Sequence, residues 1–348
     1  MAYTDIDKPS DYFNTKLYTG NGASSHAISG VGFQSDWTWI KNRSSAVNHA
    51  LTDSVRTAPL RLMSQSTEAE INQTTGLLSF NSDGFTVGSD SGYNGNGNSM
   101  VSWNWKAGGS ASSNSNGSIT SSVSASTDAG FSIVSYTGNG SAGATVGHGL
   151  GSVPQMLILK GRDQVENWTV YHEGLTSNNY ALRLNGTAAQ FSQTLSWNNT
   201  TPTSSVFTLG GGAGTNDYTN RSVTSMIAYC FAEKQGYSKF GSYVGNGNAD
   251  GTFVYTGFKP AFFLFKNSSS AGSWVLVDAK RPGFNVINDS LNTNNSNAEN
   301  TATVCDFTSN GVKFRTNADH MNGSYTFIYA CFAENPLVTS TGVPATAR

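Results

Sequence analysis

The sequence predicts an all-β protein made of tandem β-sandwich units with a jelly-roll-like architecture. The motif Tyr-x-Gly-Asn-Gly starts three times, at Tyr18, Tyr136 and Tyr243. At a nearly constant distance after each copy comes a short apolar run that ends in a lysine. Short apolar or alternating runs between Gly/Asn turns, without a long helical period, are typical of strands in such sandwiches. We therefore predict three internal repeats of roughly 100 residues each.

The composition supports a folded protein with a large apolar core. Charged residues make up 12% of the 348 residues, about half of the usual quarter. The 7 Trp, 14 Tyr and 19 Phe provide a large apolar area to bury. A net charge of −2 gives no electrostatic reason to bind nucleic acid or an anionic membrane. No apolar run approaches the ~18 residues of a membrane span, so we expect neither a nucleic-acid partner nor membrane insertion.

The repeat anchors divide the chain into six segments. They are the N-terminal arm 1–14, unit one 15–109, a linker 110–127, unit two 128–235, unit three 236–335 and the C-terminal tail 336–348. The linker consists almost entirely of Gly, Ala, Ser and Asn, which is typical of a flexible or lightly packed segment. No comparable segment separates units two and three, so we expect these two to dock closely and unit one to be joined more loosely.

Within each unit, the strongest strand signals are the apolar run and the closing aromatic run. The apolar runs are 37–41, 156–160 and 262–266, and the closing runs are 103–105, 229–231 and 330–332. We expect the tryptophans of these strands to lie in the core. The three cysteines, Cys230, Cys305 and Cys331, are an odd number without CxxC spacing. This pattern favours small buried hydrophobic residues in a protein made in a reducing compartment.

The Gly-Asn-Gly sequences allow two interpretations. A phosphate-binding loop requires a helix directly after the glycines, and neither a helical pattern nor a Gly-Lys-Ser/Thr sequence follows them. A hairpin turn that needs a positive φ angle explains the glycines better.

A lysine and an acidic residue recur together in two of the units. Lys41 and Asp53 have the same spacing as Lys266 and Asp278, whereas Lys160 is followed by His172. Such a pair can pin neighbouring strands as an ion pair or belong to a site. A pair that one unit replaces favours the structural interpretation, and the functional one stays open.

The sequence offers no arrangement that predicts catalysis, and we expect no enzyme activity, catalytic residue, metal site or cofactor. The five histidines have neither HExxH nor Gly-x-Ser-x-Gly surroundings. The acidic loop 89–96 lacks the closing Glu of an EF-hand. A glycosidase needs two carboxylates that face one cleft, and the many Asp and Glu residues leave a glycan depolymerase open as an alternative.

Aromatic residues in polar loops are the candidates for binding a surface glycan, because a sugar ring stacks well on an aromatic face. The candidates are Tyr93, Trp197 and Tyr218. Tryptophans within the repeat strands are expected to serve the core instead.

Several longer phrases resemble those of a family of bacteriophage virion proteins found in phages of marine bacteria and described as tail-fibre-like or structural. They are 83–90, 103–109, 241–247, 253–262, 274–278, 306–311 and 329–336. The resemblance covers nearly the whole chain and implies a virion component, without catalytic residues to carry over. The chain departs from a typical fibre because it has neither a shaft nor a separate trimerisation segment.

These observations together predict a non-enzymatic surface protein of a phage virion, tail-fibre-like and adhesive to host surface glycan. It would be made in the host cytoplasm and exposed on the particle. A head-decorating or cement protein is the alternative within this class, and the depolymerase is the alternative outside it. The expected partners are other virion proteins and copies of the same chain, with a trimer suggested by analogy. The arm and the tail have few apolar anchors, so we expect them to dock on a neighbouring subunit or virion protein.

Overall fold

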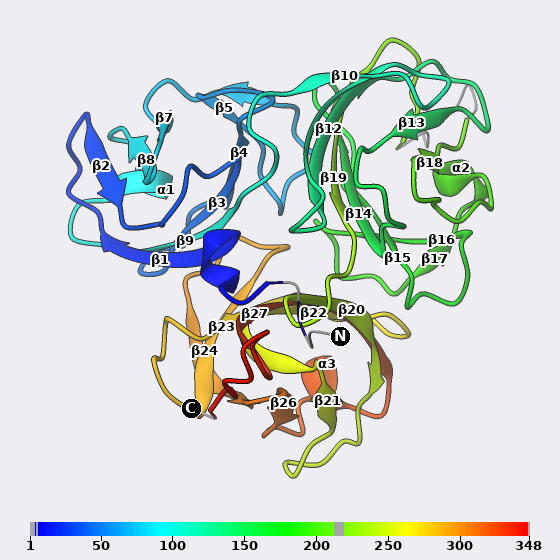
Figure 1. Cartoon of the computed structure of the whole chain (residues 1–348). Coiled ribbons are helices and arrows are strands. Elements are labelled where there is room, and N and C mark those ends of the chain that lie inside the picture. Colours follow the sequence, from blue (N-terminus) through cyan, green and yellow to red (C-terminus); the bar gives the residue numbers. More distant parts are fainter. Residues whose placement is uncertain (1–3, 5, 212–218, 347–348) are drawn as a thin grey trace.

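The computed structural model describes Thr4, residues 6–211 and residues 219–346. Strands account for 44% of the chain and helices for 4%, and the prediction of an all-β, sandwich-like fold is confirmed. Figure 1 shows three β-rich lobes that meet around a common centre. No helix in the described part is long and apolar enough to cross a membrane.

Unit one contains a four-stranded sheet, a three-stranded sheet and a short two-stranded sheet. Their orders are β1-β9-β3-β4, β2-β8-β7 and β5-β6. The elements are the 3₁₀-helix η1 (Pro9–Asp11), β1 (Phe13–Thr19), β2 (His26–Ser29), β3 (Trp37–Asn42), β4 (Ala50–Asp53), β5 (Leu60–Arg61), β6 (Ile71–Asn72), β7 (Leu77–Asn81), β8 (Gly84–Val87), α1 (Ser91–Asn94) and β9 (Ser99–Trp105).

Unit two forms an eight-stranded sheet of order β10-β11-β12-β19-β14-β15-β16-β17 and a pair β13-β18. The elements are β10 (Ser112–Asn114), β11 (Ser121–Ser126), β12 (Phe131–Thr137), β13 (Thr145–Gly147), β14 (Met156–Gly161), β15 (Thr169–His172), β16 (Tyr180–Arg183), β17 (Phe191–Ser192), α2 (Thr194–Trp197), β18 (Val206–Thr208) and β19 (Ser225–Phe231).

Unit three forms one eight-stranded sheet of order β20-β27-β22-β23-β24-β25-β26-β21. The elements are β20 (Ser238–Val244), β21 (Phe253–Tyr255), β22 (Phe258–Asn267), β23 (Trp274–Asp278), β24 (Ile287–Asn292), β25 (Asn300–Thr308), β26 (Gly311–Phe314), α3 (Asp319–Asn322) and β27 (Thr326–Pro336). The paired strands in all three units are antiparallel.

A block of four neighbouring strands has the same order in the three units. It reads β1-β9-β3-β4 in unit one, β12-β19-β14-β15 in unit two and β20-β27-β22-β23 in unit three. In each block, the strand that contains the motif tyrosine is paired with the closing aromatic strand. On its other side, the closing strand is paired with the strand that contains the lysine. The blocks thus occupy corresponding places, and a full superposition of the three units stays a prediction.

The lysine strands carry mostly apolar side chains because both of their faces are buried. In β22, Phe262 and Leu264 lie in the common centre, while Phe263 and Phe265 lie in the core of unit three itself. Successive side chains of a strand point to opposite faces. A strand with a core on each side therefore reads as a continuous apolar run, which is the pattern that the sequence displays.

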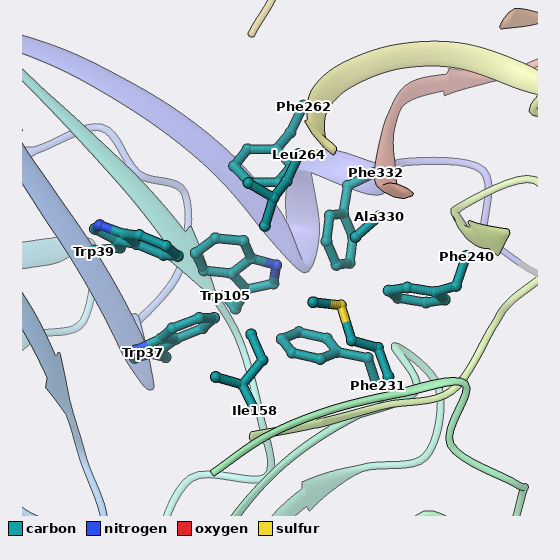
Figure 2. A pocket seen from close by; sticks show the side chains of 11 residues that line it. Trp37, Trp39, Trp105, Ile158, Phe231, Phe240, Phe262, Leu264, Ala330 and Phe332 are labelled. Atoms are coloured by element: carbon teal, nitrogen blue, oxygen red, sulfur yellow. The ribbon is translucent and has the colours of Figure 1, made fainter. Parts of the chain in front are cut away.

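The centre of the molecule is an aromatic cluster to which every unit contributes. Figure 2 shows Trp105 between side chains of the other two units. The Trp105 ring centroid lies 4.9 Å from that of Phe13, 5.5 Å from that of Phe262 and 5.7 Å from that of Phe332. Trp37 stacks on Tyr229 of unit two at 4.3 Å. The packing leaves a void of only about 10 Å³ there, so this is a core and not a binding site.

Two expectations about the joining of the units are wrong. Residues 110–127 do not form a free linker, because β10 and β11 extend the large sheet of unit two and Val123 is buried. Unit one is not loosely attached, because it contacts unit two and unit three around the aromatic centre. The composition of the linker misled us because serine side chains are small enough to pack in edge strands whose backbone hydrogen bonds supply the order.

The described part of the arm packs on its own chain, and docking of the arm and the tail on another subunit or virion protein stays a prediction. The Thr4 hydroxyl donates to the Gln235 carbonyl at 3.1 Å, Ile6 is buried, and Phe13 starts β1 inside the aromatic centre. In the tail, the backbone N–H of Ser340 donates to Asp7 at 2.6 Å. The described parts of the arm and the tail therefore contact each other.

The Tyr-x-Gly-Asn-Gly motif forms the same clasp in each unit. The tyrosine hydroxyl donates to a backbone carbonyl beside the short helical segment, and the asparagine pairs with a second, buried asparagine. The hydroxyl bonds are Tyr18 to Tyr93, Tyr136 to Thr219 and Tyr243 to Met321, and the amide pairs are Asn94 to Asn21, Asn220 to Asn139 and Asn322 to Asn246, at 2.6–3.0 Å.

The glycines of the motif have two different roles. The first approaches backbone so closely that a Cβ at Gly245 would lie 2.1 Å from the Gly323 carbonyl oxygen. The second has the predicted positive φ, which is 64° at Gly247. The turn is not a hairpin, however, because the strands on either side of it are not neighbours in a sheet.

The three cysteines are free and buried, as predicted. Burial raises the pKa of Cys230 to about 12, so its thiol stays protonated and serves as a small core side chain.

Candidate functional site

The polar groups that the repeats share gather where two units meet. We name these places the one–three, two–one and three–two junctions after the units that form them. At each junction, the lysine at the end of the central strand donates to a backbone carbonyl of the next unit. The bonds run from Lys41 to Ser296, from Lys160 to Thr67 and from Lys266 to Thr187, at 3.1–3.2 Å. The junctions close a ring because each unit donates to one neighbour and accepts from the other.

The three lysines are buried, and burial lowers the pKa of each ammonium group to about 8. Each ammonium group also donates to a carbonyl of its own unit, namely that of Asn42, Gln164 or Asn267. A buried ammonium group needs such acceptors, since a lost partner leaves a charge in a low-dielectric interior. The lysines thus fasten the neighbouring loops.

The expected ion pairs between Lys41 and Asp53 and between Lys266 and Asp278 do not form. Antiparallel pairing places Trp37 opposite Asp53, so the lysine at the other end of β3 lies far along the strand. Asp53 instead accepts from the Arg56 Nε at 2.5 Å, and Asp278 accepts from the Arg281 Nε at 2.6 Å. The role is structural as the sequence favoured, but the partner is an arginine three residues later.

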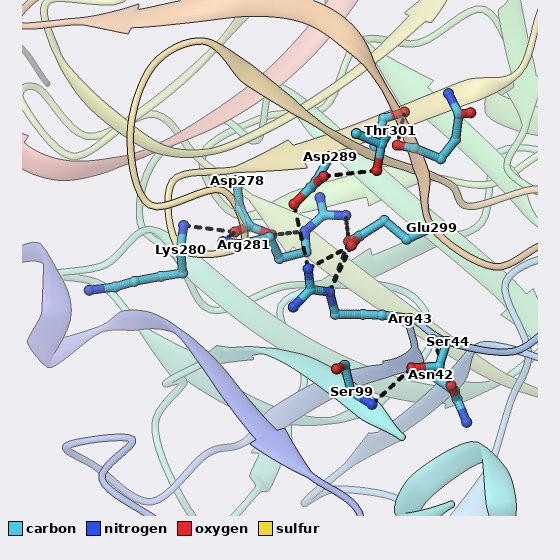
Figure 3. A network of polar contacts seen from close by, with 12 residues as sticks. Asn42, Arg43, Ser44, Ser99, Asp278, Lys280, Arg281, Asp289, Glu299 and Thr301 are labelled. Atoms are coloured by element: carbon cyan, nitrogen blue, oxygen red, sulfur yellow. Dashed lines mark hydrogen bonds and ion pairs between the residues drawn. The ribbon is translucent and has the colours of Figure 1, made fainter. Parts of the chain in front are cut away.

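At the one–three junction, a half-buried carboxylate joins two arginines from different units. Figure 3 shows Glu299 beside Arg43 of unit one and Arg281 of unit three. Glu299 oxygens accept from the Arg43 Nη2 at 2.6 Å and from the Arg281 Nη1 at 2.8 Å. The Trp103 Nε1 of unit one donates to Asp278 at 3.0 Å. Such charge-assisted bonds are stronger and more directional than neutral ones.

The two–one junction repeats this network with different residues. Glu70 of unit one accepts from the Arg162 Nη2 of unit two at 2.7 Å and from the Arg56 Nη1 of its own unit at 2.7 Å. The Tyr229 hydroxyl of unit two donates to Asp53 at 2.7 Å. Burial acts to raise the pKa of Glu70, but the hydrogen bonds and charges of the two arginines outweigh it and lower the pKa.

The three–two junction uses neutral groups at the corresponding places. The Gln190 backbone N–H donates to the Ser268 carbonyl at 2.9 Å, where the other two junctions have a glutamate and an arginine. His172 stands in the place of the aspartate, and its Nε2 contacts the Tyr329 carbonyl at 3.0 Å. This junction therefore depends on the neutral form of a histidine.

The surroundings of His172 fix its tautomer. The Nδ1 atom accepts from the Gly174 N–H at 3.0 Å, which leaves the Nε2–H to donate to Tyr329. His49 at the one–three junction is held in the same way, since its Nδ1 accepts from the Trp39 Nε1 at 2.9 Å. A second proton would have to displace one of these donors. Burial lowers the pKa of His49 to about 3 and that of His172 to about 4.

We expect the protein to lose stability through His172 as the pH falls from 7.5 to 5. The unfolded imidazole binds a proton near pH 6.5 and the folded one only near pH 4, so the unfolded state binds more protons between these values and stability declines. At pH 5 the contribution is about 2 kcal/mol. Urea unfolding at the two pH values should show a smaller loss for His172→Gln than for the wild type.

The neighbouring Glu173 acts in the opposite direction, because burial and the Glu233 charge raise its pKa to about 7. Glu173 is present in both proteins, so its effect cancels in this comparison. Equal pH dependence of the two proteins would contradict the assignment to His172.

Two of the three residues predicted to bind a glycan, Tyr93 and Trp197, are buried. Tyr93 and Trp197 are each only 1% exposed. Tyr93 packs in the core of unit one and Trp197 in that of unit two, so neither ring offers a face to a sugar. Tyr218 lies outside the described residues. The prediction failed for these two residues because each lies in a four-residue helix that buries its aromatic side chain.

The structure instead exposes two aromatic side chains on strand β21, at the edge of the sheet of unit three. Phe253 is 44% exposed and Tyr255 51%, while Val254 between them is buried. Because alternate side chains share a face, both rings project from the same side. The Phe253 ring lies against Gly311, where a Cβ would approach its Cζ at 2.7 Å. We name these two residues the β21 aromatic pair.

Two polar hollows lie on units one and three at corresponding places. The first, which we name the Arg61 hollow, has a volume of about 290 Å³ and is lined by Asn48, Arg61, Asp90 and Ser91 among others. The second, the Asn297 hollow, has a volume of about 300 Å³ and is lined by Ser290, Asn292, Asn297, Asn300 and His320 among others. Each borders the short helix, α1 or α3, against which the Tyr-x-Gly-Asn-Gly clasp closes.

The described residues contain no group of three or more His, Cys, Asp or Glu side chains arranged to hold a metal ion. The charged groups of the junctions, in contrast, are already engaged with one another. Among the described residues, the two hollows and the β21 aromatic pair are candidate surfaces for a ligand.

Comparison with known protein families places the whole ring in one family. The match covers residues 8–336, and the family is described as a domain of unknown function, DUF7483. The chain belongs to the DUF7483 family. No curated protein and no solved structure matches it. Because the match begins before η1 and ends at the last residue of β27, the DUF7483 domain comprises all three units and not one repeat.

Several residues of the DUF7483 junctions were missed by the sequence analysis. Trp168 and Trp274 stand at the same distance after the repeated lysine as His49 does, and all three contact a carbonyl of the next unit. This spacing was a usable signal. Glu70 and Glu299 had no such signal, because the segments that precede them differ in length between units.

Proposed function

We propose that this chain is a non-enzymatic surface protein of a bacteriophage particle that attaches the particle to its host. The observation that carries the proposal is the β21 aromatic pair, two exposed rings on one face of an edge strand. An exposed aromatic pair is suited to stack on sugar rings of a surface glycan. The resemblance of the sequence to virion proteins supplies the phage setting.

The ring around the pair is suited to carry such a surface. Its buried lysines, arginines and carboxylates fasten one unit to the next, so the pair is held by a rigid body. A rigid support lowers the conformational entropy that binding has to overcome. Acid and base groups here have structural partners, which favours attachment over chemistry.

The pseudo-threefold arrangement of junctions favours a second role, decoration of the phage head. An assembly with a threefold axis offers three equivalent contacts. A ring with three corresponding junctions presents three corresponding faces and fits such a position. In this role one chain would cover one threefold site of the shell lattice.

Electron microscopy of particles labelled with an antibody against this chain tests both roles. Label at the tail or its appendages is expected for attachment, and label over the shell lattice for decoration. Particles that carry no label, although the antibody detects the purified chain, would contradict both.

A particle variant with Phe253→Ser and Tyr255→Ser tests the attachment role directly. We expect host adsorption to fall about tenfold, which corresponds to about 1.4 kcal/mol of lost binding free energy. Incorporation into particles should be unchanged, because both side chains are exposed. Phe284→Ser, which changes a side chain 78% exposed elsewhere on unit three, is the matched control. Unchanged adsorption by the double variant would count against the role of the pair.

A further inference from the structure

The two polar hollows share their position in the fold. The amides of Asn94 and Asn322, which make the same clasp bonds, end the short helices that border them. On the opposite side, each hollow borders the segment that contains Met63 or Asn292. The Met63 carbonyl contacts Trp168, and the Asn292 carbonyl contacts His49, in each case from the neighbouring unit. Two hollows of nearly equal volume at corresponding places indicate a feature that the repeats have in common.

The linings retain hydrogen-bonding capacity. In the Arg61 hollow, the Arg61 Nε is buried and has no hydrogen-bond partner among the described residues, and the Nη1 lies 3.8 Å from Asp90. That distance exceeds a hydrogen bond, so Arg61 is held close to an acceptor without being satisfied by it. An inserted hydroxyl group would be able to accept from Arg61.

The Asn297 hollow offers the same capacity through amides. No hydrogen bond is formed by the side chains of Asn292, Asn297 and Asn300 within the described part of the chain. Asn297 and Asn300 are exposed, and Asn292 is half-buried. Each amide presents donors and an acceptor together.

The linings select the class of ligand. A cation is disfavoured beside Arg61, and an anion is disfavoured beside Asp90 and, in the other hollow, beside Glu299. Apolar ligands would leave the amides and the guanidinium group unpaired. A neutral ligand with many hydroxyl groups satisfies both kinds of lining, because each hydroxyl donates one hydrogen bond and accepts others. A volume of about 300 Å³ lies at the lower end of ligand pockets, which fits a single saccharide unit.

We propose that the Arg61 hollow and the Asn297 hollow each bind one unit of a neutral, hydroxyl-rich saccharide. The inference deepens the proposed attachment function and rests on it for the source of the saccharide, a glycan on the host surface. Two sites on one rigid ring would engage a repeating glycan twice. The second contact then forms within the complex, which raises the overall affinity beyond that of either site.

Binding to the purified full chain tests the proposal without the particle. The probes are a panel of neutral hexose and N-acetylhexosamine oligosaccharides, a matched panel of uronate-containing ones, and inorganic phosphate. Isothermal titration with the monosaccharide unit of the best-bound neutral oligosaccharide is expected to give two equivalents. Arg61→Met and the pair Asn297→Ala with Asn300→Ala should each leave one equivalent, and their combination should leave none.

The control variants change the same residue types outside the hollows. Arg315→Met removes an arginine that pairs with Asp306, and Asn116→Ala removes an exposed amide of unit two. Both should keep two equivalents. Ala46→Leu and Ala298→Leu fill the hollows without removing a polar group, so they should each abolish one equivalent in a chain that unfolds at the wild-type temperature.

Three results would overturn the proposal: no binding to any neutral saccharide, binding that the hollow and filling variants leave unchanged, or binding only to uronates or phosphate. The outcome is separable from that of the proposed function. A chain that binds saccharide but is missing from particles keeps the hollows and loses the attachment role. A chain that lies on particles but binds no saccharide keeps its place on the particle and contradicts the proposal for the hollows.

Discussion

Replacing Trp105 with alanine is expected to lower the free energy of unfolding by about 3–5 kcal/mol, the range for large aromatic side chains in cores. The indole is 2% exposed and packs against Phe13, Phe262 and Phe332 in the common centre. Its N–H has no hydrogen-bond partner among the described residues, so the loss comes from packing and from the cavity. Urea unfolding followed by tryptophan fluorescence and by far-UV circular dichroism measures it.

The same experiment examines whether the ring unfolds as one body. Because Trp105 contacts side chains of unit three and its neighbour Trp37 contacts unit two, we expect both probes to report one transition at a lower urea midpoint. Separate transitions, with two units unaffected, would contradict a shared core. Phe284→Ala, at an exposed site, should change stability by less than about 0.5 kcal/mol.

The second large effect is expected for Glu299→Gln, at about 3–5 kcal/mol, because breaking a largely buried network of charges by removing one partner is strongly destabilising. Glu299 is the shared acceptor of Arg43 and Arg281. Gln has the same shape and no charge, so the two guanidinium groups lose the counter-charge that they share across the one–three junction. Arg281 keeps Asp278 and Arg43 keeps Asp289 as remaining partners. Chemical unfolding at pH 7 measures the loss.

A double-mutant cycle separates this pairing from general disruption. The three–two junction naturally has Ser268 and Gln190 where the one–three junction has Arg43 and Glu299. The double variant Arg43→Ser with Glu299→Gln copies that neutral arrangement. We expect it to be less destabilised than the sum of the single variants, with a coupling of about 1–3 kcal/mol. Additive effects would mean that the pair does not act across the junction.

The sequence predicted the strands best where a strand has a core on each face. The runs Phe262–Lys266 and Met156–Lys160 were identified because both alternating sets of side chains are apolar, whereas 37–41 was identified from its alternation. The sequence could not predict that the three units close a ring. Closure depends on which faces of separate sheets pack against each other. A run that is apolar on both faces shows that both are buried, but it does not show whether a face packs against its own unit or against another one.

The site was less predictable than the fold for a similar reason. Tyr93 and Trp197 were chosen because polar residues surround them in the sequence, but local polarity does not determine the direction of an aromatic side chain. Phe253 and Tyr255, by contrast, lie in a phrase that reads as an ordinary strand. Their exposure follows from the position of β21 at the edge of its sheet, which only the tertiary arrangement specifies.

The closed ring of junctions also removes a dependence on concentration. Three separate subunits with such contacts would be in equilibrium with their monomers, and dilution would favour dissociation by mass action. Here the lysine, arginine and histidine contacts between units are intramolecular, so the effective concentration of one unit near the next is set by the chain itself. Unfolding should accordingly show the same midpoint at any protein concentration. A protein built in this way keeps its fold at any dilution.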